Sequence, residues 1–117
     1  SKIAEAEGYF KKSLEIDPNY VEALQGMIYN VYVNGDDKAI AAIDEARKAK
    51  KMDVFNKLLA ERRAKLSKAI PYAEKIYSLN PKDLEIVSLL KGLYQTSHND
   101  AKFQEMKAVE AALKAGK

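Results

Sequence analysis

Two stretches of the chain decide its fold because they repeat one pattern. The first, Phe10–Tyr20, reads FKKSLEIDPNY, and the second, Ala73–Asp83, reads AEKIYSLNPKD. In each, apolar residues at helical spacing run into an Asp-Pro or Asn-Pro step, and another amphipathic helical pattern follows. Repetition of one helix–turn–helix unit is typical of a helical solenoid, and solenoids mostly bind other macromolecules on a concave face.

Composition bounds the classes of protein to which the chain can belong. Its 117 residues predict a single domain, 1–117, which we expect to be part of a longer array. Apolar residues make up 47% of the chain and charged residues 32%, a balance typical of a soluble, folded protein. The absence of cysteine excludes disulfides, thiol catalysis and thiolate metal sites, and no apolar run is long enough to span a membrane. The compartment stays open: cytoplasmic, or periplasmic if a signal peptide has been removed.

Helical periodicity runs through the whole chain. The apolar spacing predicts helices at about 2–16, 18–34, 37–50, 53–79, 82–97 and 100–113. No stretch alternates with a period of two, so no sheet is expected. The predicted fold class is all-α, an array of five or six helices, and the lower number applies if the second helix runs on through Gly35 with a bulge.

Turn residues predict where these helices begin and end. Asp17-Pro18 and Asn80-Pro81 each place a capping residue before a proline that suits the first helical position, so both steps are expected to start a helix. Gly35 follows the second helix as a left-handed cap, and Asp36 is the expected N-cap of the third.

Pro71 interrupts the long pattern of the fourth helix. If a new helix began at this proline, Ile70 would have to be its N-cap, and isoleucine is a poor cap. We therefore expect one long helix that is kinked at Pro71.

The quoted residues resemble the tetratricopeptide repeat (TPR), a unit of two antiparallel helices. Its second helix is matched by Ala6, Phe10, Ser13, Leu14 and Pro18, and again by Ala69, Ala73 and Pro81. Its first helix and Gly-Asp turn are matched by Leu24, Met27, Val31 and Gly35-Asp36, and the helix once more by Val87, Leu90 and Tyr94. Residues 100–113 look like the closing helix of such an array. The resemblance implies a right-handed α-α superhelix with a C-terminal capping helix.

Three departures from the repeat are visible. The usual tryptophan is absent, and Ile28 and Lys91 stand where a small residue is common. Pro18 and Pro81 are 63 residues apart, which is neither one nor two repeats of about 34 residues. The excess, about 39–66, resembles the long-helix insertion of some bacterial TPR proteins, which end in a segment similar to 71–81.

A peptide groove is what the resemblance implies about function. The first helix of each repeat lines the concave face, which here corresponds to Asn19, Tyr20, Glu22, Gln25, Tyr29, Tyr32, Val33, Glu85, Ser88, Gly92, Gln95 and Thr96. Tyrosines suit peptide contacts, and Gly92 would let a ligand backbone approach closely. The alternative is that Tyr29 and Tyr32 pack against the inserted helices and fill the groove. The expected function is a non-enzymatic scaffold that binds a protein or peptide of unknown identity.

A basic block offers a second interpretation. Residues 47–68 carry nine basic and two acidic side chains, a net charge of +7, whereas the rest of the chain sums to −4. The patch would consist of Arg47, Lys48, Lys50, Lys51, Arg62, Arg63 and Lys65. It could bind nucleic acid or an anionic membrane, but nucleic acid is disfavoured because the block has a single aromatic residue, Phe55. A solvated helix face is the better explanation of the block, and association of copies through the exposed ends of the array is a further alternative.

Catalysis is not expected. His98, the only histidine, lies in a Ser-His-Asn-Asp turn where polar residues are common, and no cysteine or activated serine completes a nucleophile. Asp36-Asp37 and Asp44-Glu45 lack the spacing of a calcium loop, and no glycine-rich phosphate loop is present. We predict no catalytic residue, metal site or cofactor.

Overall fold

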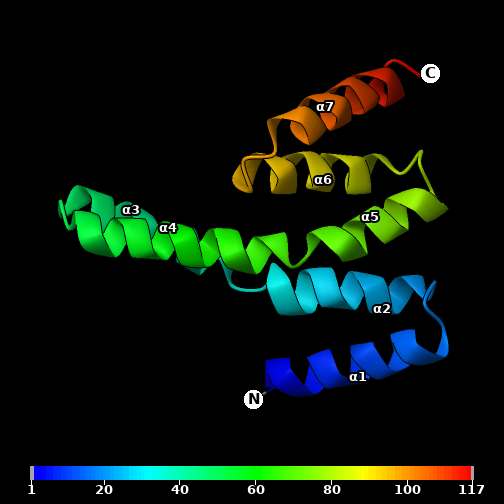
Figure 1. The fold of residues 1–117 in the computed structure, drawn as a ribbon, viewed down its shortest axis with the longest axis horizontal. Coiled ribbons are helices and arrows are strands. Elements are labelled where there is room, and N and C mark those ends of the chain that lie inside the picture. Colours follow the sequence, from blue (N-terminus) through cyan, green and yellow to red (C-terminus); the bar gives the residue numbers. More distant parts are fainter. Residues whose placement is uncertain (1, 117) are drawn as a thin grey trace.

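The computed structural model describes residues 2–116, and all of the regular structure in that range is helical (Figure 1). The elements are α1 (Lys2–Ile16), α2 (Val21–Gln25), η1 (Gly26–Tyr32), α3 (Asp36–Lys48), α4 (Met52–Ser67), α5 (Ile70–Leu79), α6 (Leu84–Thr96) and α7 (Asp100–Lys114). The π-helical segment η1 continues α2 without a break. The all-α prediction is confirmed for the described residues.

The helices form a thin stack from which one hairpin projects. In Figure 1, α1, α2, α5, α6 and α7 lie one above the other, and each is packed against its neighbours in that order. The α3–α4 hairpin, which contains the predicted insertion 39–66, leaves the stack after η1 and extends to one side. The chain then returns through α5, which packs between α2 and α6. The overall extents of 44 × 38 × 18 Å reflect this flat arrangement.

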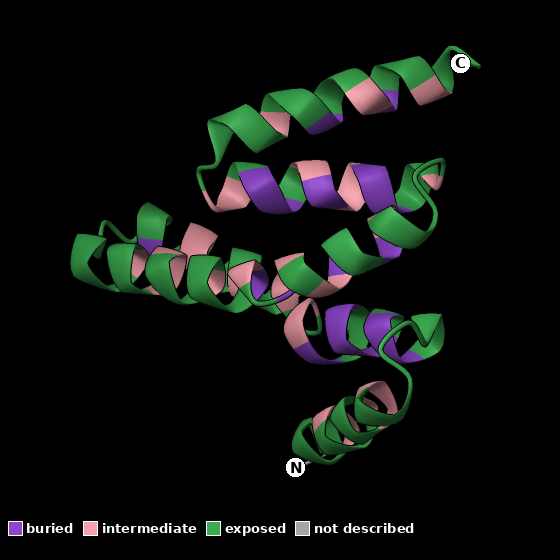
Figure 2. Cartoon of the chain, turned by 45° about the vertical axis from the view of Figure 1, so that its right-hand side comes forward, coloured by how far each residue is buried: buried purple, intermediate pink, exposed green. Residues whose placement is uncertain are grey.

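The core lies within the stack rather than in the hairpin. Met27, Ile28, Val87 and Leu90 have the largest fully buried side chains, and they come from η1 and α6. Figure 2 shows buried residues concentrated on α2, η1, α5 and α6, whereas α3 and α4 contribute only Ala46 and Leu66. On the other side of α6, α7 packs with Met106 buried. The predicted apolar faces of the second and fifth helices are therefore the core-forming ones.

The two Asp-Pro and Asn-Pro steps do not start helices, contrary to the sequence prediction. The Oδ1 atom of Asp17 accepts a hydrogen bond from the Asn19 amide at 3.0 Å, which makes a local turn, and α2 begins only at Val21. After Asn80-Pro81, α6 begins at Leu84, because Asp83 caps it by accepting from the amides of Glu85 and Ile86. An Asx turn thus competes successfully with the N-cap role of Asp17.

The expected long kinked helix is also wrong, because the chain forms two helices there. Helix α4 ends at Ser67 and α5 begins at Ile70, with Ala69 as an N-cap that has no side-chain hydrogen bond. Pro71 has no amide to donate to the carbonyl of Ser67, and its ring crowds that carbonyl. The amides of Lys68 and Ala69 instead bond three residues back, to Lys65 and Leu66, in a tightened turn.

Gly35 separates two helices, as expected. It adopts a left-handed conformation with φ of 81°, which glycine enters without the steric cost that a Cβ atom brings. Helix α3 starts at the next residue, Asp36, whose side chain makes no N-cap hydrogen bond, contrary to the prediction. That carboxylate is directed instead toward α4.

Candidate functional site

One face of α6 carries the residues that the sequence analysis assigned to a groove. Glu85, Ser88, Gly92 and Gln95 follow one another at intervals of three or four, so they lie along one side of the helix. Glu85, Gly92 and Gln95 are exposed and Ser88 is half-buried. The opposite side of α6, with Val87, Leu90 and Tyr94, is buried in the core. The helix thus presents a continuous polar strip on an apolar support.

Beside this strip lies a hollow of about 350 Å³. It is formed where α6 meets α4 and the η1–α3 connection, and its lining residues are Val33, Asp36, Arg62, Leu66, Ser88, Leu89, Gly92, Leu93, Gln95 and Thr96. Five of the twelve residues that the repeat resemblance assigned to the groove are in this set. The floor is aliphatic and the rim is polar, which is the usual construction of a site that binds an organic ligand.

Gly92 keeps the hollow open. A Cβ atom built at this position would meet no atom within 4 Å outside its own helix. Glycine in a helix interior costs roughly 0.5–1 kcal/mol relative to alanine, because it has more conformational freedom to lose. No neighbouring atom requires the missing side chain, so packing within the chain does not explain this glycine.

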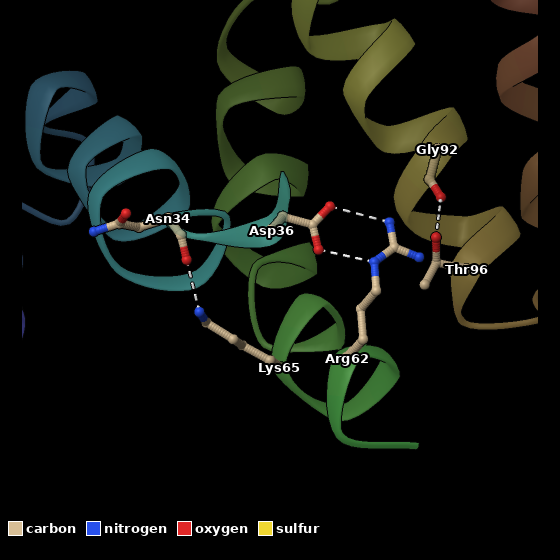
Figure 3. Close-up of polar contacts among 6 residues, drawn as sticks. All are labelled: Asn34, Asp36, Arg62, Lys65, Gly92 and Thr96. Atoms are coloured by element: carbon tan, nitrogen blue, oxygen red, sulfur yellow. Dashed lines mark hydrogen bonds and ion pairs between the residues drawn. The ribbon is translucent and has the colours of Figure 1, made fainter. Parts of the chain in front are cut away.

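An ion pair forms one wall of the hollow. Arg62 on α4 reaches across to Asp36 at the start of α3, with Nε–Oδ1 at 2.8 Å and Nη2–Oδ2 at 3.1 Å (Figure 3). Both side chains are mostly covered, being 24% and 20% exposed, and hydrogen bonding to Asp36 raises the pKa of Arg62. The guanidinium stays charged at every accessible pH.

The third nitrogen of Arg62 has no partner among the described residues. Nη1 takes part in no hydrogen bond or ion pair with any residue in the described range. Figure 3 shows this end of the guanidinium directed toward Gly92 and Thr96 of α6. Nearby, Lys65 donates to the carbonyl oxygen of Asn34 at 2.7 Å, which fixes the η1–α3 connection against α4.

Ser88 connects the hollow with α7. Its hydroxyl donates to Glu110, and Lys91 donates to the other carboxylate oxygen of Glu110 at 2.6 Å. Both hydrogen bonds hold the pKa of Glu110 below its usual value, and the one from Lys91 has the larger effect. Ser88 also lines the hollow, and because its proton is used in this way, its oxygen can take part in further hydrogen bonds only as an acceptor.

A second, smaller hollow adjoins the first. It measures about 250 Å³ and is lined by Leu59, Arg62, Arg63, Gln95, Thr96 and His98. His98 has a positive φ of 60°, and the amides of His98 and Asn99 bond back to the carbonyls of Gln95 and Tyr94. This is a Schellman ending of α6 with histidine in the position that glycine usually takes. Arg62, Gln95 and Thr96 are common to both hollows, so the two form one groove along α4 and α6.

The remaining predicted groove residues lie outside these hollows. Tyr29 of η1 lies near Glu85, and burial followed by the charge of Glu85 raises the pKa of its phenol. Tyr32 stacks on Tyr72 of α5 with ring centroids 6.0 Å apart, and its hydroxyl donates to Glu7. The other four, Asn19, Tyr20, Glu22 and Gln25, are exposed around the α1–α2 turn and on α2. Tyr32 therefore packs within the chain, but against α5 and α1 rather than against the inserted helices of the alternative interpretation.

The basic residues separate into groups rather than forming one surface. Arg47 and Lys48 at the end of α3 both pair with Asp44, whose pKa they lower. Lys50 and Lys51 occupy the turn at the tip of the hairpin. Arg62, Arg63 and Lys65 lie ten or more residues further along α4, about 15 Å away at the helical rise per residue.

Residues 2–116 offer neither a metal site nor a membrane-spanning helix. No group of three or more His, Asp or Glu side chains in that range is arranged to hold a metal ion. No described helix is both long and apolar enough to cross a membrane. His98, the one candidate for acid–base chemistry, is exposed at the rim of the second hollow.

No family model, curated protein or solved structure matches this chain. The resemblance to the TPR therefore depends on the quoted residues alone. Sequence reasoning missed the aliphatic floor of the groove, Leu66, Leu89 and Leu93, because aliphatic residues at helical spacing are interpreted as core. It placed Arg62 in a basic patch and Asp36 at a helix cap. The two residues are 26 positions apart in the sequence, and no sequence pattern indicates that they form an ion pair.

Proposed function

We propose that this chain is a non-enzymatic, TPR-like scaffold that binds an extended peptide segment in the groove between α4 and α6. The order of packing supports the repeat interpretation, since α2–η1 and α6 alternate with α1, α5 and α7 in the stack. In such an array α2–η1 and α6 are the first helices of their repeats, and their outer faces line one side. The right-handed superhelix remains part of this proposal.

The open space at Gly92 is the observation that carries the proposal. A helix position facing solvent would be more stable with alanine, yet here glycine leaves room above an aliphatic floor. A peptide side chain fits a hollow of about 350 Å³, and the peptide backbone can approach the helix only where no Cβ intervenes.

Polar groups around the floor match the needs of a peptide main chain. The exposed carboxamide of Gln95 offers a donor and an acceptor, the Ser88 oxygen accepts, and Nη1 of Arg62 donates. Because the Arg62 guanidinium is already held by Asp36, a ligand carbonyl would bind a preorganised donor. The groove therefore suits an extended segment with one apolar side chain.

Peptide selection with a blocked variant tests the proposal. A random peptide library displayed on phage is selected against the wild-type chain, and the affinities of the selected peptides are measured by fluorescence polarisation. Gly92→Leu places a side chain in the hollow from a position where a Cβ meets nothing within 4 Å, so binding should fall at least about tenfold while stability is kept or raised.

Gly8→Leu is the matched control. Gly8 is an exposed helical glycine on α1 whose Cβ would also meet nothing within 4 Å, and it lies outside the groove. Affinity in this variant should equal that of the wild type. Failure to enrich any peptide, or equal loss in both variants, would show that the groove is not the binding site.

A further inference from the structure

The tip of the α3–α4 hairpin exposes apolar side chains far from the core. Met52 is 49% exposed and Val54 is 45% exposed, in the first turn of α4. The hairpin carries few buried residues and projects beyond the stack of the other helices (Figures 1 and 2). These two side chains thus stand at an extremity of the molecule.

Positive charge surrounds this apolar pair. Residues 47–54, which we call the hairpin tip, contain four basic side chains, Arg47, Lys48, Lys50 and Lys51, and one acidic side chain, Asp53, for a net charge of +3. Asp44 partly neutralises Arg47 and Lys48. Neither Lys50 nor Lys51 belongs to any ion pair found among residues 2–116. One depression is lined by Lys50, Lys51, Met52, Asp53 and Val54, so charge and apolar surface are contiguous.

Lys50 holds a conformation that lysine disfavours. Its φ is 59°, and the amides of Lys50 and Lys51 bond back to the carbonyls of Arg47 and Ala46 at 3.1 and 3.0 Å. This is a Schellman ending, in which the left-handed position usually belongs to glycine. The Lys50 side chain is exposed, so packing does not explain a lysine at this position.

We propose that the hairpin tip docks on the surface of an anionic lipid bilayer. Met52 and Val54 would enter the boundary between headgroups and acyl chains, while Lys50 and Lys51 contact the anionic headgroups. Apolar side chains with a basic surround are the combination that binds such surfaces, because burial of apolar area adds to attraction by the lipid charge.

Nucleic acid fits the same tip less well. Phosphate contacts would use the lysines, but Met52 and Val54 would remain exposed and have no role. Stacking on bases needs accessible aromatic rings, and the nearest ring in the sequence, Phe55, is half-buried. A membrane uses all four side chains, whereas a nucleic acid uses two.

The tip and the groove can be occupied together. Met52 is ten residues from Arg62 along α4, which corresponds to about 15 Å. Docking by the tip therefore contacts the bilayer at a point about 15 Å from the α4–α6 groove. The inference does not depend on the proposed peptide binding.

Sedimentation with vesicles tests the inference. The full chain is mixed with phosphatidylcholine vesicles that contain about 30% phosphatidylserine, an anionic fraction that attracts basic segments. Met52→Ser/Val54→Ser should weaken binding about tenfold through lost apolar burial. Lys50→Gln/Lys51→Gln should weaken it about twentyfold. Lys50→Gly should weaken binding several-fold while it relieves the backbone strain, so unfolding cannot explain its loss.

Matched controls carry the same changes elsewhere. Lys12→Gln/Lys107→Gln removes two exposed charges on α1 and α7, and Ile16→Ser changes an isoleucine that is 87% exposed. Both controls should bind vesicles within about twofold of the wild type, because each basic residue matters only near the surface. Circular dichroism confirms that all variants keep their helix content.

A fluorescent label reports insertion directly. The chain has no cysteine, so Met52→Cys or Ile16→Cys can be labelled at one site with an environment-sensitive dye. The inference predicts a blue shift at position 52 and none at position 16 when anionic vesicles are added. Absence of sedimentation, equal losses in the controls, or binding of a single-stranded oligonucleotide that depends on the lysines but not on Met52 would overturn it.

Discussion

Two hydrogen bonds join Arg62 to Asp36 across the base of the α3–α4 hairpin, Nε–Oδ1 at 2.8 Å and Nη2–Oδ2 at 3.1 Å. The pair sits at the edge of the core and in the wall of the groove. It therefore connects the stability of the hairpin with the shape of the site.

Breaking this pair should destabilise the chain. Arg62→Ala and Asp36→Ala each leave a partly buried charge without its partner, and each should lower the free energy of unfolding by about 1–3 kcal/mol. In the double variant the loss should be clearly smaller than the sum, because the shared interaction can be lost only once. Urea denaturation of the four proteins gives the coupling free energy. Strictly additive losses would mean that the pair contributes nothing of its own.

Alanine should have opposite effects at two glycines. At Gly92, in regular helix with open space around it, alanine should raise the free energy of unfolding by about 0.5–1 kcal/mol. At Gly35, where φ is 81°, alanine should lower it by about 1 kcal/mol although the space there is equally open. Thermal unfolding of both variants checks that the free energy of unfolding rises for Gly92→Ala and falls for Gly35→Ala. A stabilising Gly35→Ala would contradict the left-handed turn.

Gly26 should tolerate no side chain. A Cβ there would lie 2.3 Å from the ring of Phe10, so Gly26→Ala should cost about 1–3 kcal/mol through overpacking between α1 and η1. The double variant Gly26→Ala/Phe10→Leu should recover part of that loss, because the shorter side chain makes room. If the urea midpoint of the double variant is no higher than that of Gly26→Ala, the close contact with Phe10 is not the cause of the destabilisation.

Glu110 should make stability depend on pH. Hydrogen bonds from Lys91 and Ser88 hold its pKa below the usual 4.5, so its contribution to folding is present above that value. It is lost as the pH falls through the lowered folded-state pKa, because the proton then binds the unfolded chain more tightly than the folded one. Glu110→Gln should thus lose less stability than the wild type between about pH 7 and about pH 3. Equal losses in urea titrations would show that Glu110 is not responsible.

Much of the helical layout was predictable from the sequence, and the reasons are local. The limits of α1 were predicted, and the apolar positions of the second helix, Leu24, Met27, Ile28 and Val31, are all buried. Spacing alone defines such faces. The break at Gly35 was also predicted, since the left-handed position after a helix is usually occupied by glycine.

Other features depend on competition that the sequence does not resolve. Asp17 can cap a helix or close an Asx turn, and Asp83, two residues beyond Pro81, is an equally good cap for α6. The break at Pro71 was misjudged because Ala69 starts α5 without any side-chain cap. In the groove, Gly92 and Gln95 were predicted from the repeat resemblance, but the wall made by Arg62 and Asp36 depends on how the hairpin returns to the stack.

Amide chemical shifts test the central claim, that a peptide occupies the α4–α6 groove, most directly. A peptide selected against the wild-type chain is titrated into the ¹⁵N-labelled protein and the perturbed amides are mapped. Peptide binding in the groove predicts the largest changes at Val33, Leu89, Gly92, Gln95 and Thr96, which line the hollow. Changes concentrated on α1 or α7, with these five amides unmoved, would contradict it.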